Sequence, residues 1–154
     1  MKKVYFIGIG GIGMSAIARY FLHQGLVVAG YDKTPTPLTD SLTKEGMAIH
    51  FTDDVALIPE ACKDADSTLV VYTPAIPSSH SELTFFRNNG FELQKRAQVL
   101  GTLAGAYKAL CVAGTHGKTT TSAMIAYLLS KTELGCSAFL GGIAKNFCTL
   151  HQQP

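Results

Sequence analysis

The sequence predicts an α/β protein, with a doubly wound parallel sheet followed by the incomplete start of a second, nucleotide-binding domain. Two observations support this fold class. Short apolar runs alternate with amphipathic helical patterns up to about residue 106, as expected for strands and helices wound around a parallel sheet. In addition, a glycine-rich stretch follows an apolar run twice, at residues 8–13 and 114–121. Such strand-to-helix joints bind phosphate through backbone N–H groups.

The first strand and helix have the clearest pattern. Val4 to Ile9 is an apolar run that ends in glycines. The apolar residues that follow are spaced for one buried helix face, and they are Met14, Ile17, Ala18, Phe21 and Leu22. Gly25 is expected to end this helix, and Leu26 to Tyr31 to form the second strand.

The rest of the first domain continues the alternation. The further elements that we expect are a loop at 34–37, a helix over about 38–45, a strand near 47–50, a strand over 68–72, a helix over about 80–89, a strand near 91–93 and a helix over 97–106. Residues 73–79 form a loop with two prolines at the carboxyl end of a strand, where ligands of open α/β sheets bind. The first domain is therefore predicted to cover residues 1–106.

Residues 107–154 are predicted to be the beginning of a P-loop domain. Their pattern is a strand over Ala109 to Ala113, a loop, a helix and a strand near Ser137 to Leu140. Because these residues are too few for such a domain, we expect the chain to be an inactive fragment of a longer enzyme. The two apolar strands would lack partners, which predicts self-association or packing onto the first domain.

Composition excludes several classes of protein. Apolar residues make up 47% of the chain, and 13 basic residues against 11 acidic ones leave a formal charge of +2 without a basic block. This favours a globular protein that binds no nucleic acid. No apolar run approaches the length of a membrane span, and no signal peptide is apparent, so a cytoplasmic location is expected. The cysteines share no CxxC spacing, and neither disulfides nor a zinc site with the histidines is predicted.

The first glycine-rich stretch, Gly8–Gly13, fits the pattern GxGxxG, and Asp32 follows the second strand. In this pattern the glycines allow a tight turn, close approach of a diphosphate and close packing of helix on strand. Asp32 would accept a hydrogen bond from a ribose hydroxyl. The motif alone predicts a nucleotide diphosphate, which leaves both NAD(P) and a UDP-linked compound open.

The second stretch, Gly114–Thr121, resembles a P-loop in which the first glycine lies two positions later than usual. Lys118 is placed to reach the outer phosphates, and Thr119 to ligate Mg²⁺. We therefore predict binding of ATP with Mg²⁺. A dehydrogenase needs no second phosphate loop, whereas an ATP-driven enzyme with a UDP-linked substrate needs both.

Four segments together resemble the Mur ligases of peptidoglycan synthesis. They are Gly8–Ser15, Ala75–Pro77, Arg96–Ala97 and Gly114–Thr121, and the resemblance extends from Val4 to Gly142. It implies a Rossmann-like first domain and a cytoplasmic enzyme of cell-wall synthesis, needed for cell shape and division. Within the family, the sequence is most similar to the members that join L-alanine to the lactyl carboxylate of UDP-N-acetylmuramate through an acyl phosphate. The alternatives are a ligase of the same family that recycles murein tripeptide, an NAD(P)-binding oxidoreductase domain and a non-catalytic nucleotide-binding module.

The resemblance also implies the site residues. Those expected to hold the UDP-sugar are Gly8, Gly10, Gly11, Ile12, Gly13, Ser15, Asp32, Thr73, Ala75, Ile76, Pro77 and Arg96. Those expected to hold ATP are Gly114, Thr115, His116, Gly117, Lys118, Thr119 and Thr120, with Lys118 and Thr119 catalytic and Thr119 on Mg²⁺. For Ser15, Thr73 and Ser78, local hydrogen bonds to the backbone are an equal alternative. His116 has an alternative as an exposed loop residue, and Arg96 as a cation at a helix start.

Overall fold

A computed structural model describes residues 3–142 of the chain. The chain divides into two compact units, residues 1–107 and 108–154, and each is described by itself. None of the described helices is long and apolar enough to cross a membrane.

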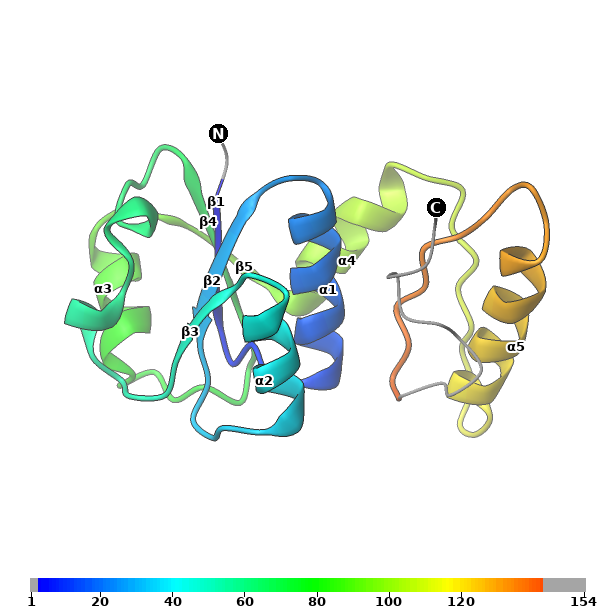
Figure 1. The fold of residues 1–154 in the computed structure, drawn as a ribbon, viewed down its shortest axis with the longest axis horizontal. Helices are drawn as coiled ribbons and strands as arrows, with labels where there is room; N and C mark the ends of the chain where they lie inside the picture. The colour runs from blue at the N-terminus through cyan, green and yellow to red at the C-terminus, as the bar shows by residue number, and fades with distance from the viewer. Residues whose placement is uncertain (1–2, 143–154) are drawn as a thin grey trace. The chain divides into compact units, whose positions relative to one another are not determined.

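The first unit is built on one parallel sheet (Figure 1). Its five strands are β1 (Lys3–Ile7), β2 (Val27–Tyr31), β3 (Ala48–His50), β4 (Thr68–Tyr72) and β5 (Glu92–Lys95), in the order β3-β2-β1-β4-β5. All four pairings are parallel, with Tyr5 of β1 opposite Ala29 of β2 and Val70 of β4. This confirms the predicted doubly wound α/β fold. The strand order reverses next to β1, which is where ligands of this architecture bind.

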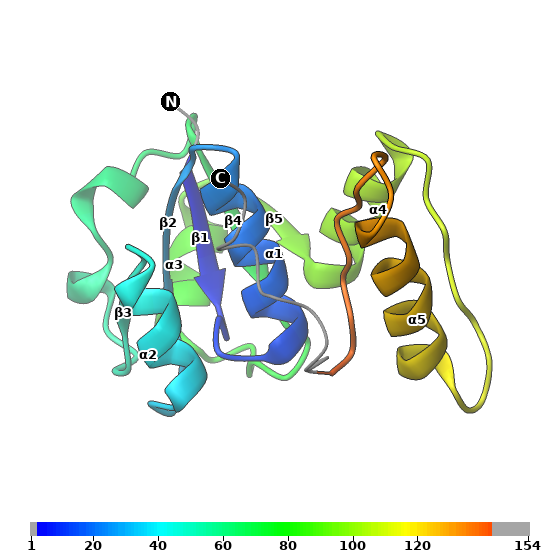
Figure 2. The same ribbon diagram turned by 45° about the vertical axis from the view of Figure 1, so that its right-hand side comes forward.

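Helices cover both faces of the sheet (Figures 1 and 2). One face carries α1 (Ile12–His23), α2 (Pro37–Lys44) and α4 (Arg96–Gly105), and the other carries α3 (Ser81–Asn88). Beside α3 lie two single-turn 3₁₀ helices, η1 (Val55–Leu57) and η2 (Glu60–Cys62). The sequence prediction missed these two turns, because three residues are too short to show a helical period.

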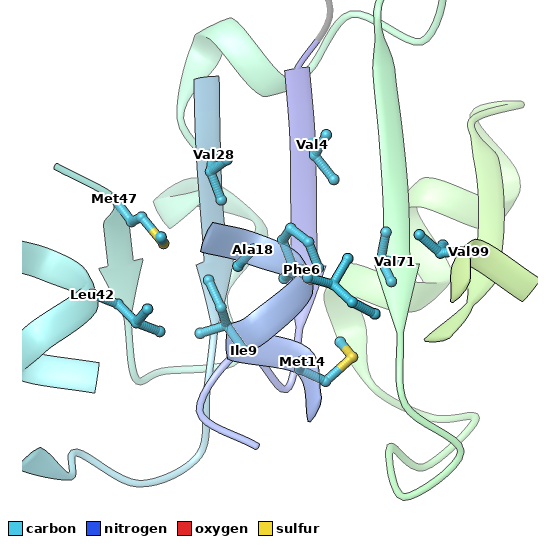
Figure 3. Packing of buried hydrophobic residues seen from close by; sticks show 11 residues of the cluster. Val4, Phe6, Ile9, Met14, Ala18, Val28, Leu42, Met47, Val71 and Val99 are labelled. Atoms are coloured by element: carbon cyan, nitrogen blue, oxygen red, sulfur yellow. The ribbon is translucent and has the colours of Figure 1, made fainter. Parts of the chain in front are cut away.

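Alternation along the strands divides the core into two clusters. Val4 and Phe6 of β1 point toward α1, whereas Tyr5 and Ile7 point toward α3, and all four are at most 1% exposed. Figure 3 shows the first cluster, which includes Met14 and Ala18 from the face of α1 that the sequence predicted, with Leu42, Val71 and Val99. Because both faces are buried, the three central strands β1, β2 and β4 read as nearly continuous apolar runs.

Aromatic rings dominate the second cluster. The ring of Phe86 from α3 lies 4.9 Å from that of Tyr5 and 4.8 Å from that of Phe91, measured between centroids. The second pair is edge-to-face, a favourable geometry for aromatic rings. These contacts attach α3 firmly to the centre of the sheet.

In the second unit the structure describes one helix, α5 (Lys118–Ser130), between irregular segments. The strands predicted at residues 109–113 and 137–140 are wrong for the described part of this unit, since neither forms a ladder. A strand exists only when a neighbouring backbone accepts and donates its hydrogen bonds. Several large apolar side chains of this unit are correspondingly exposed, as Leu110 is at 70% and Leu128 at 66%.

We expect Gly30→Ala to destabilise the first unit by about 2 kcal/mol, the typical cost of an overpacked core. A Cβ at Gly30 would lie 2.5 Å from the carbonyl oxygen of Phe6, which is backbone of the adjoining central strand and cannot turn aside. Gly101→Ala is the matched control, because its Cβ would meet nothing within 4 Å and alanine favours the helix. Urea unfolding followed by circular dichroism would test both, and equal midpoints for the two variants would contradict the expectation.

Candidate nucleotide-binding site

The glycine loop follows β1 at the carboxyl edge of the sheet. The amide groups of Gly8 and Ile9 donate hydrogen bonds to the carbonyl oxygen of Tyr31, at 2.8 and 3.1 Å, so β1 stops pairing regularly at Ile7. Gly8 has a φ of 90°, which L side chains rarely adopt, and a Cβ there would lie 2.7 Å from Cγ2 of Thr73. The glycine loop and the loop that begins at Thr73 therefore lie directly against each other.

Asp32 is hydrogen-bonded to the glycine loop. Its Oδ2 accepts a hydrogen bond of 2.7 Å from the amide of Gly10, and its Oδ1 accepts one of 3.2 Å from the amide of Thr34. A Cβ on Gly10 would come within 2.8 Å of Oδ2. Both carboxylate oxygens are thus bonded to backbone amides, an arrangement that the sequence did not predict for this residue.

The N-terminus of α1 points out of this loop with free donors. The N-cap residue Gly11 has no side chain to cap the helix, and within the described chain the amides of Ile12 and Gly13 have no acceptor. Gly11 and Ile12 are exposed. Arg96 at the start of α4 lies over this turn, since a Cβ on Gly13 would be 2.3 Å from its Nη1. Open amides, a helix N-terminus and a guanidinium together form a site for an anion.

The loop after β4 brings the remaining predicted residues close. The amide of Ile76 donates to the carbonyl of Thr73 at 3.1 Å, and Cδ1 of Ile76 also faces Gly8. Ala75 and Pro77 are exposed. Ser15 differs, because it is buried and its hydroxyl donates to the carbonyl of Ile12 at 2.9 Å. Its hydroxyl thus makes the local bond named as the alternative, and ligand contact by Ser15 stays a prediction.

The second glycine-rich stretch forms an exposed turn before α5. Gly117 is the N-cap of α5 with a φ of 76°, and the carbonyl of Gly117 accepts from the amide of Thr121 at 2.9 Å. Nζ of Lys118 donates to the carbonyl oxygens of Gly114 and Thr115, at 2.5 and 3.1 Å. Thr115, His116, Thr119 and Thr120 are exposed on the same turn. The ammonium group thus bridges the loop that the sequence predicted to hold phosphate.

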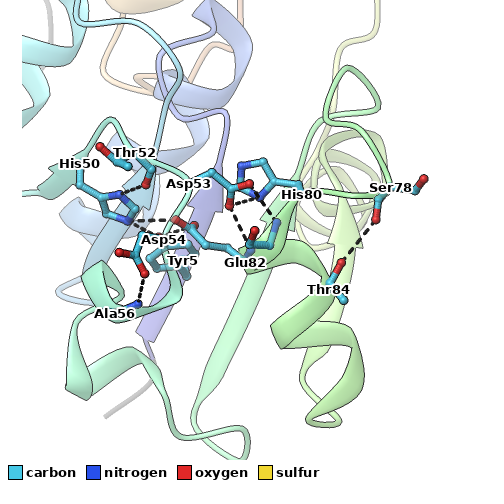
Figure 4. A network of polar contacts seen from close by, with 11 residues as sticks. Tyr5, His50, Thr52, Asp53, Asp54, Ala56, Ser78, His80, Glu82 and Thr84 are labelled. Atoms are coloured by element: carbon cyan, nitrogen blue, oxygen red, sulfur yellow. Dashed lines mark hydrogen bonds and ion pairs between the residues drawn. The ribbon is translucent and has the colours of Figure 1, made fainter.

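A buried polar cluster lies on the α3 face of the sheet (Figure 4). The hydroxyl of Tyr5 is 2.7 Å from Oε2 of Glu82 and 2.7 Å from Nε2 of His50. Nδ1 of His50 is 3.0 Å from the carbonyl oxygen of Thr52. Glu82 is completely buried, although it sits in the first turn of α3, a position that sequence reasoning treats as an ordinary exposed acid.

Burial controls the ionisation of this cluster. It raises the pKa of Glu82 to about 7, with a further increase from the charge of Asp53 and an opposing effect of the hydrogen bond to Tyr5. Burial also raises the pKa of Tyr5 and lowers the pKa of His50 and of His80. For Asp53, burial is outweighed by hydrogen bonds from the amides of Ser81 and Glu82, so its pKa is lowered. Burial therefore favours a neutral Glu82 below about pH 7, and near neutral pH it favours a neutral His50.

No group of three or more His, Cys, Asp or Glu side chains in the described part of the chain is arranged to hold a metal ion. Cys62 is buried, and Cys111 and Cys136 are exposed free thiols. Cys148 and His151 lie outside the described residues.

Comparison with known proteins shows the family of the chain. The model of the Mur ligase family, catalytic domain, matches residues 3–108. The chain belongs to the Mur ligase family. A relative from Phocaeicola vulgatus, UDP-N-acetylmuramate--L-alanine ligase, is 61% identical over 149 residues, which are 97% of this chain and 32% of the relative. The protein of the same name from Parabacteroides distasonis is 63% identical over 147 residues, covering 96% and 32%.

Solved structures of Mur ligases share the fold. A UDP-N-acetylmuramate-alanine ligase from Thermotoga maritima matches with a TM-score of 0.69 and 33% identity, over 84% of this chain and 29% of that one. The ligase for L-alanyl-gamma-D-glutamyl-meso-diaminopimelate from Neisseria meningitides matches with a TM-score of 0.83 and 28% identity, over 96% and 45%. The chain spans about a third of the length of the curated relatives that it matches.

Proposed function

We propose that this chain is the substrate-binding part, with the start of the ATPase part, of a ligase that joins L-alanine to UDP-N-acetylmuramate. Residues 1–106 would hold the UDP-sugar, and residues 107–154 would begin the ATP-binding domain of this cytoplasmic enzyme of peptidoglycan synthesis. The proposal rests on relatives about 60% identical that carry this name. L-alanine itself would be bound by parts of the longer protein.

One structural observation supports the first half of the proposal most strongly. The glycine loop, the loop at 73–77 and Arg96 meet at the N-terminus of α1, beside the point where the strand order reverses. A diphosphate placed there would accept hydrogen bonds from the amides of Ile12 and Gly13, and Arg96 would offset its charge. The lactyl carboxylate would remain outside this site, free to receive the γ-phosphoryl group of ATP.

The contacts of Asp32 do not distinguish the ligase from the oxidoreductase alternative. In dinucleotide-binding domains the equivalent acid accepts hydrogen bonds from the ribose, and here each oxygen of Asp32 accepts from one backbone amide and keeps a lone pair for a further donor. Calorimetry on this chain would separate the two functions. We expect binding of UDP-N-acetylmuramate and none of NADH; the reverse result would rule out the ligase proposal.

Arg96→Ala should weaken binding of UDP-N-acetylmuramate roughly tenfold to a hundredfold, because a hydrogen bond to a charged group contributes roughly 1.5–3 kcal/mol. Arg87→Ala is the matched control, since Arg87 is an exposed arginine in the last turn of α3. Titration calorimetry would give both dissociation constants. Equal affinities for the two variants would remove Arg96 from the proposed site.

In the second half, ATP with Mg²⁺ is proposed to bind at the turn before α5. The amides of this turn and Lys118 would hold the phosphates, and the hydroxyl of Thr119 would ligate the metal. When bound, Mg²⁺ would neutralise charge on the phosphates. The amine of L-alanine would then attack the acyl phosphate formed on UDP-N-acetylmuramate, which would form the amide bond and release phosphate. Catalysis would depend mainly on positioning and electrostatics.

A second candidate substrate is murein tripeptide, because the Neisseria tripeptide ligase has the higher TM-score of the two structures described above. Sequence identity favours L-alanine, at 33% against 28% for these structures and about 60% for the curated relatives. In a chain extended to the length of the relatives, release of phosphate that depends on L-alanine would support the first candidate. Release that depends on the tripeptide would support the second.

A further inference from the structure

The loop that begins at Thr73 connects β4 to α3 and spans residues 73–80. The position of the start of α3 therefore determines where this loop ends. The amide of His80 donates to the carbonyl of Pro77 at 3.1 Å, which joins the end of the loop to the helix start. The N-cap residue of α3 is His80, and its side chain makes no capping hydrogen bond. The first amides of α3 therefore need an acceptor from elsewhere.

Asp53, from the segment after β3, supplies that acceptor (Figure 4). Its Oδ2 accepts from the amide of Ser81 at 3.0 Å, and its Oδ1 accepts from the amide of Glu82 at 3.2 Å. Oδ1 also lies 3.2 Å from Nδ1 of His80, which is buried. One carboxylate thus holds the end of the loop and the start of the helix across 28 residues of sequence.

These contacts continue to the glycine loop. The ring of His80 packs edge-on against the ring of Tyr31, with centroids 4.6 Å apart. The carbonyl of Tyr31 in turn accepts from the amides of Gly8 and Ile9. Both loops of the candidate site are therefore connected to the element that Asp53 holds.

From these contacts we infer that Asp53 is a positioning residue, which holds the loop at 73–80 against the glycine loop in the geometry that receives the nucleotide-sugar. Asp53 is outside the loops that would contact the ligand, and it acts through His80 and the first turn of α3. This inference rests on the proposed function for the identity of the ligand, but the positioning itself is a property of the chain alone.

The test compares Asp53→Ala with Asp54→Ala. Asp54 is the matched control, because it is the next residue and its Oδ1 caps η1 through the amide of Ala56 at 2.8 Å. Removal of a capping acceptor should raise the dissociation constant for UDP-N-acetylmuramate on the order of fivefold in Asp53→Ala. Asp54→Ala should bind as the unchanged chain does. Asp53→Asn should recover only part of the affinity, since its single amide oxygen can accept from one of the two amides that the carboxylate holds.

Hydrogen exchange without ligand provides the second measurement. In Asp53→Ala the amides of Ile76 and His80, which are hydrogen-bonded within the loop, should exchange faster, and in Asp54→Ala they should not. A cap that serves stability alone would lower the melting temperature and leave the affinity and the exchange of Ile76 unchanged, and this result would overturn the inference. If the unchanged chain fails to bind UDP-N-acetylmuramate, the proposed function is wrong, and exchange at Ile76 still decides the role of Asp53.

Discussion

Glu82→Gln is expected to stabilise the first unit increasingly as the pH rises from 4.5 to 7, reaching about 3 kcal/mol at most. The pKa of Glu82 is about 7 in the folded chain against an ordinary value of 4.5. A raised pKa means that the folded state binds the proton more tightly, so the contribution of Glu82 is fully present below 4.5. It is lost progressively until about pH 7, above which the carboxyl is ionised in both states. Glutamine is uncharged throughout and avoids this loss.

Urea unfolding at pH 5, 6, 7 and 8, followed by circular dichroism, would measure the difference between the two proteins. The lowered pKa of His80 reduces stability in acid, but it acts in both proteins and should largely cancel. The pKa of His50 is also lowered, and because His50 is coupled to Glu82 through Tyr5, its altered titration adds to the measured difference in acid. Glu92→Gln is the control for loss of a carboxylate at an exposed position of β5. A difference between Glu82→Gln and the unchanged chain that is constant from pH 5 to 8 would contradict the expectation.

Lys118→Ala should reduce turnover about a hundredfold or more in a chain extended to the length of the relatives, as expected when a group that stabilises transition-state charge is lost. The ammonium of Lys118 already lies at the centre of the turn before α5, bonded to two of its carbonyl oxygens. Phosphate release in the presence of UDP-N-acetylmuramate and L-alanine would be measured.

The matched control is Lys131→Ala, which removes a lysine at the opposite end of α5. Nζ of Lys131 lies 5.4 Å from the centre of the Tyr127 ring, away from the phosphate turn. The Lys131→Ala variant should keep most of the turnover of the unchanged chain. Full activity of Lys118→Ala would show that the turn is only structural and would favour the oxidoreductase alternative.

The elements of the first unit were predictable because both faces of its sheet are buried. Runs such as Val4 to Ile7 are apolar throughout, and the glycines that follow mark the end of β1. The boundaries shifted by a few residues: β1 stops at Ile7, since the amides of Gly8 and Ile9 turn to Tyr31. The strand predicted at residues 109–113 is wrong, because an apolar run does not show whether a partner strand lies beside it.

The candidate site likewise has a part that the sequence predicted and a part that it did not. Its loops were found from local spacing, since glycines and a lysine at a strand-to-helix joint act within a few residues of one another. The sequence did not predict the roles of Asp53, His50 and Glu82. Each role depends on contact with a residue far away in the sequence, and Tyr5 and Glu82 are 77 residues apart. An acid in the first turn of a helix gives no signal that it faces inward.

The hydroxyl of Tyr5 lies between Glu82 and His50 and couples their protonation. The carbonyl of Thr52 can only accept, so His50 makes the hydrogen bond to Thr52 when its Nδ1 carries a hydrogen. With this bond made, two arrangements satisfy the hydroxyl of Tyr5. If Tyr5 donates to Glu82, then Nε2 of His50 must donate to Tyr5, which requires an imidazolium facing a carboxylate. If Tyr5 donates to His50, then Glu82 must carry a proton and donate to Tyr5, and both outer groups are neutral.

These two arrangements contain the same number of protons but differ in charge: one has an imidazolium and a carboxylate, and in the other both outer groups are neutral. Tyr5, His50 and Glu82 thus form one hydrogen-bonded chain between β1, β3 and α3. The raised pKa of Glu82 and the lowered pKa of His50 favour the neutral direction. The pH at which this core changes charge is therefore a joint property of three residues, and replacing one of them shifts the titration of the others.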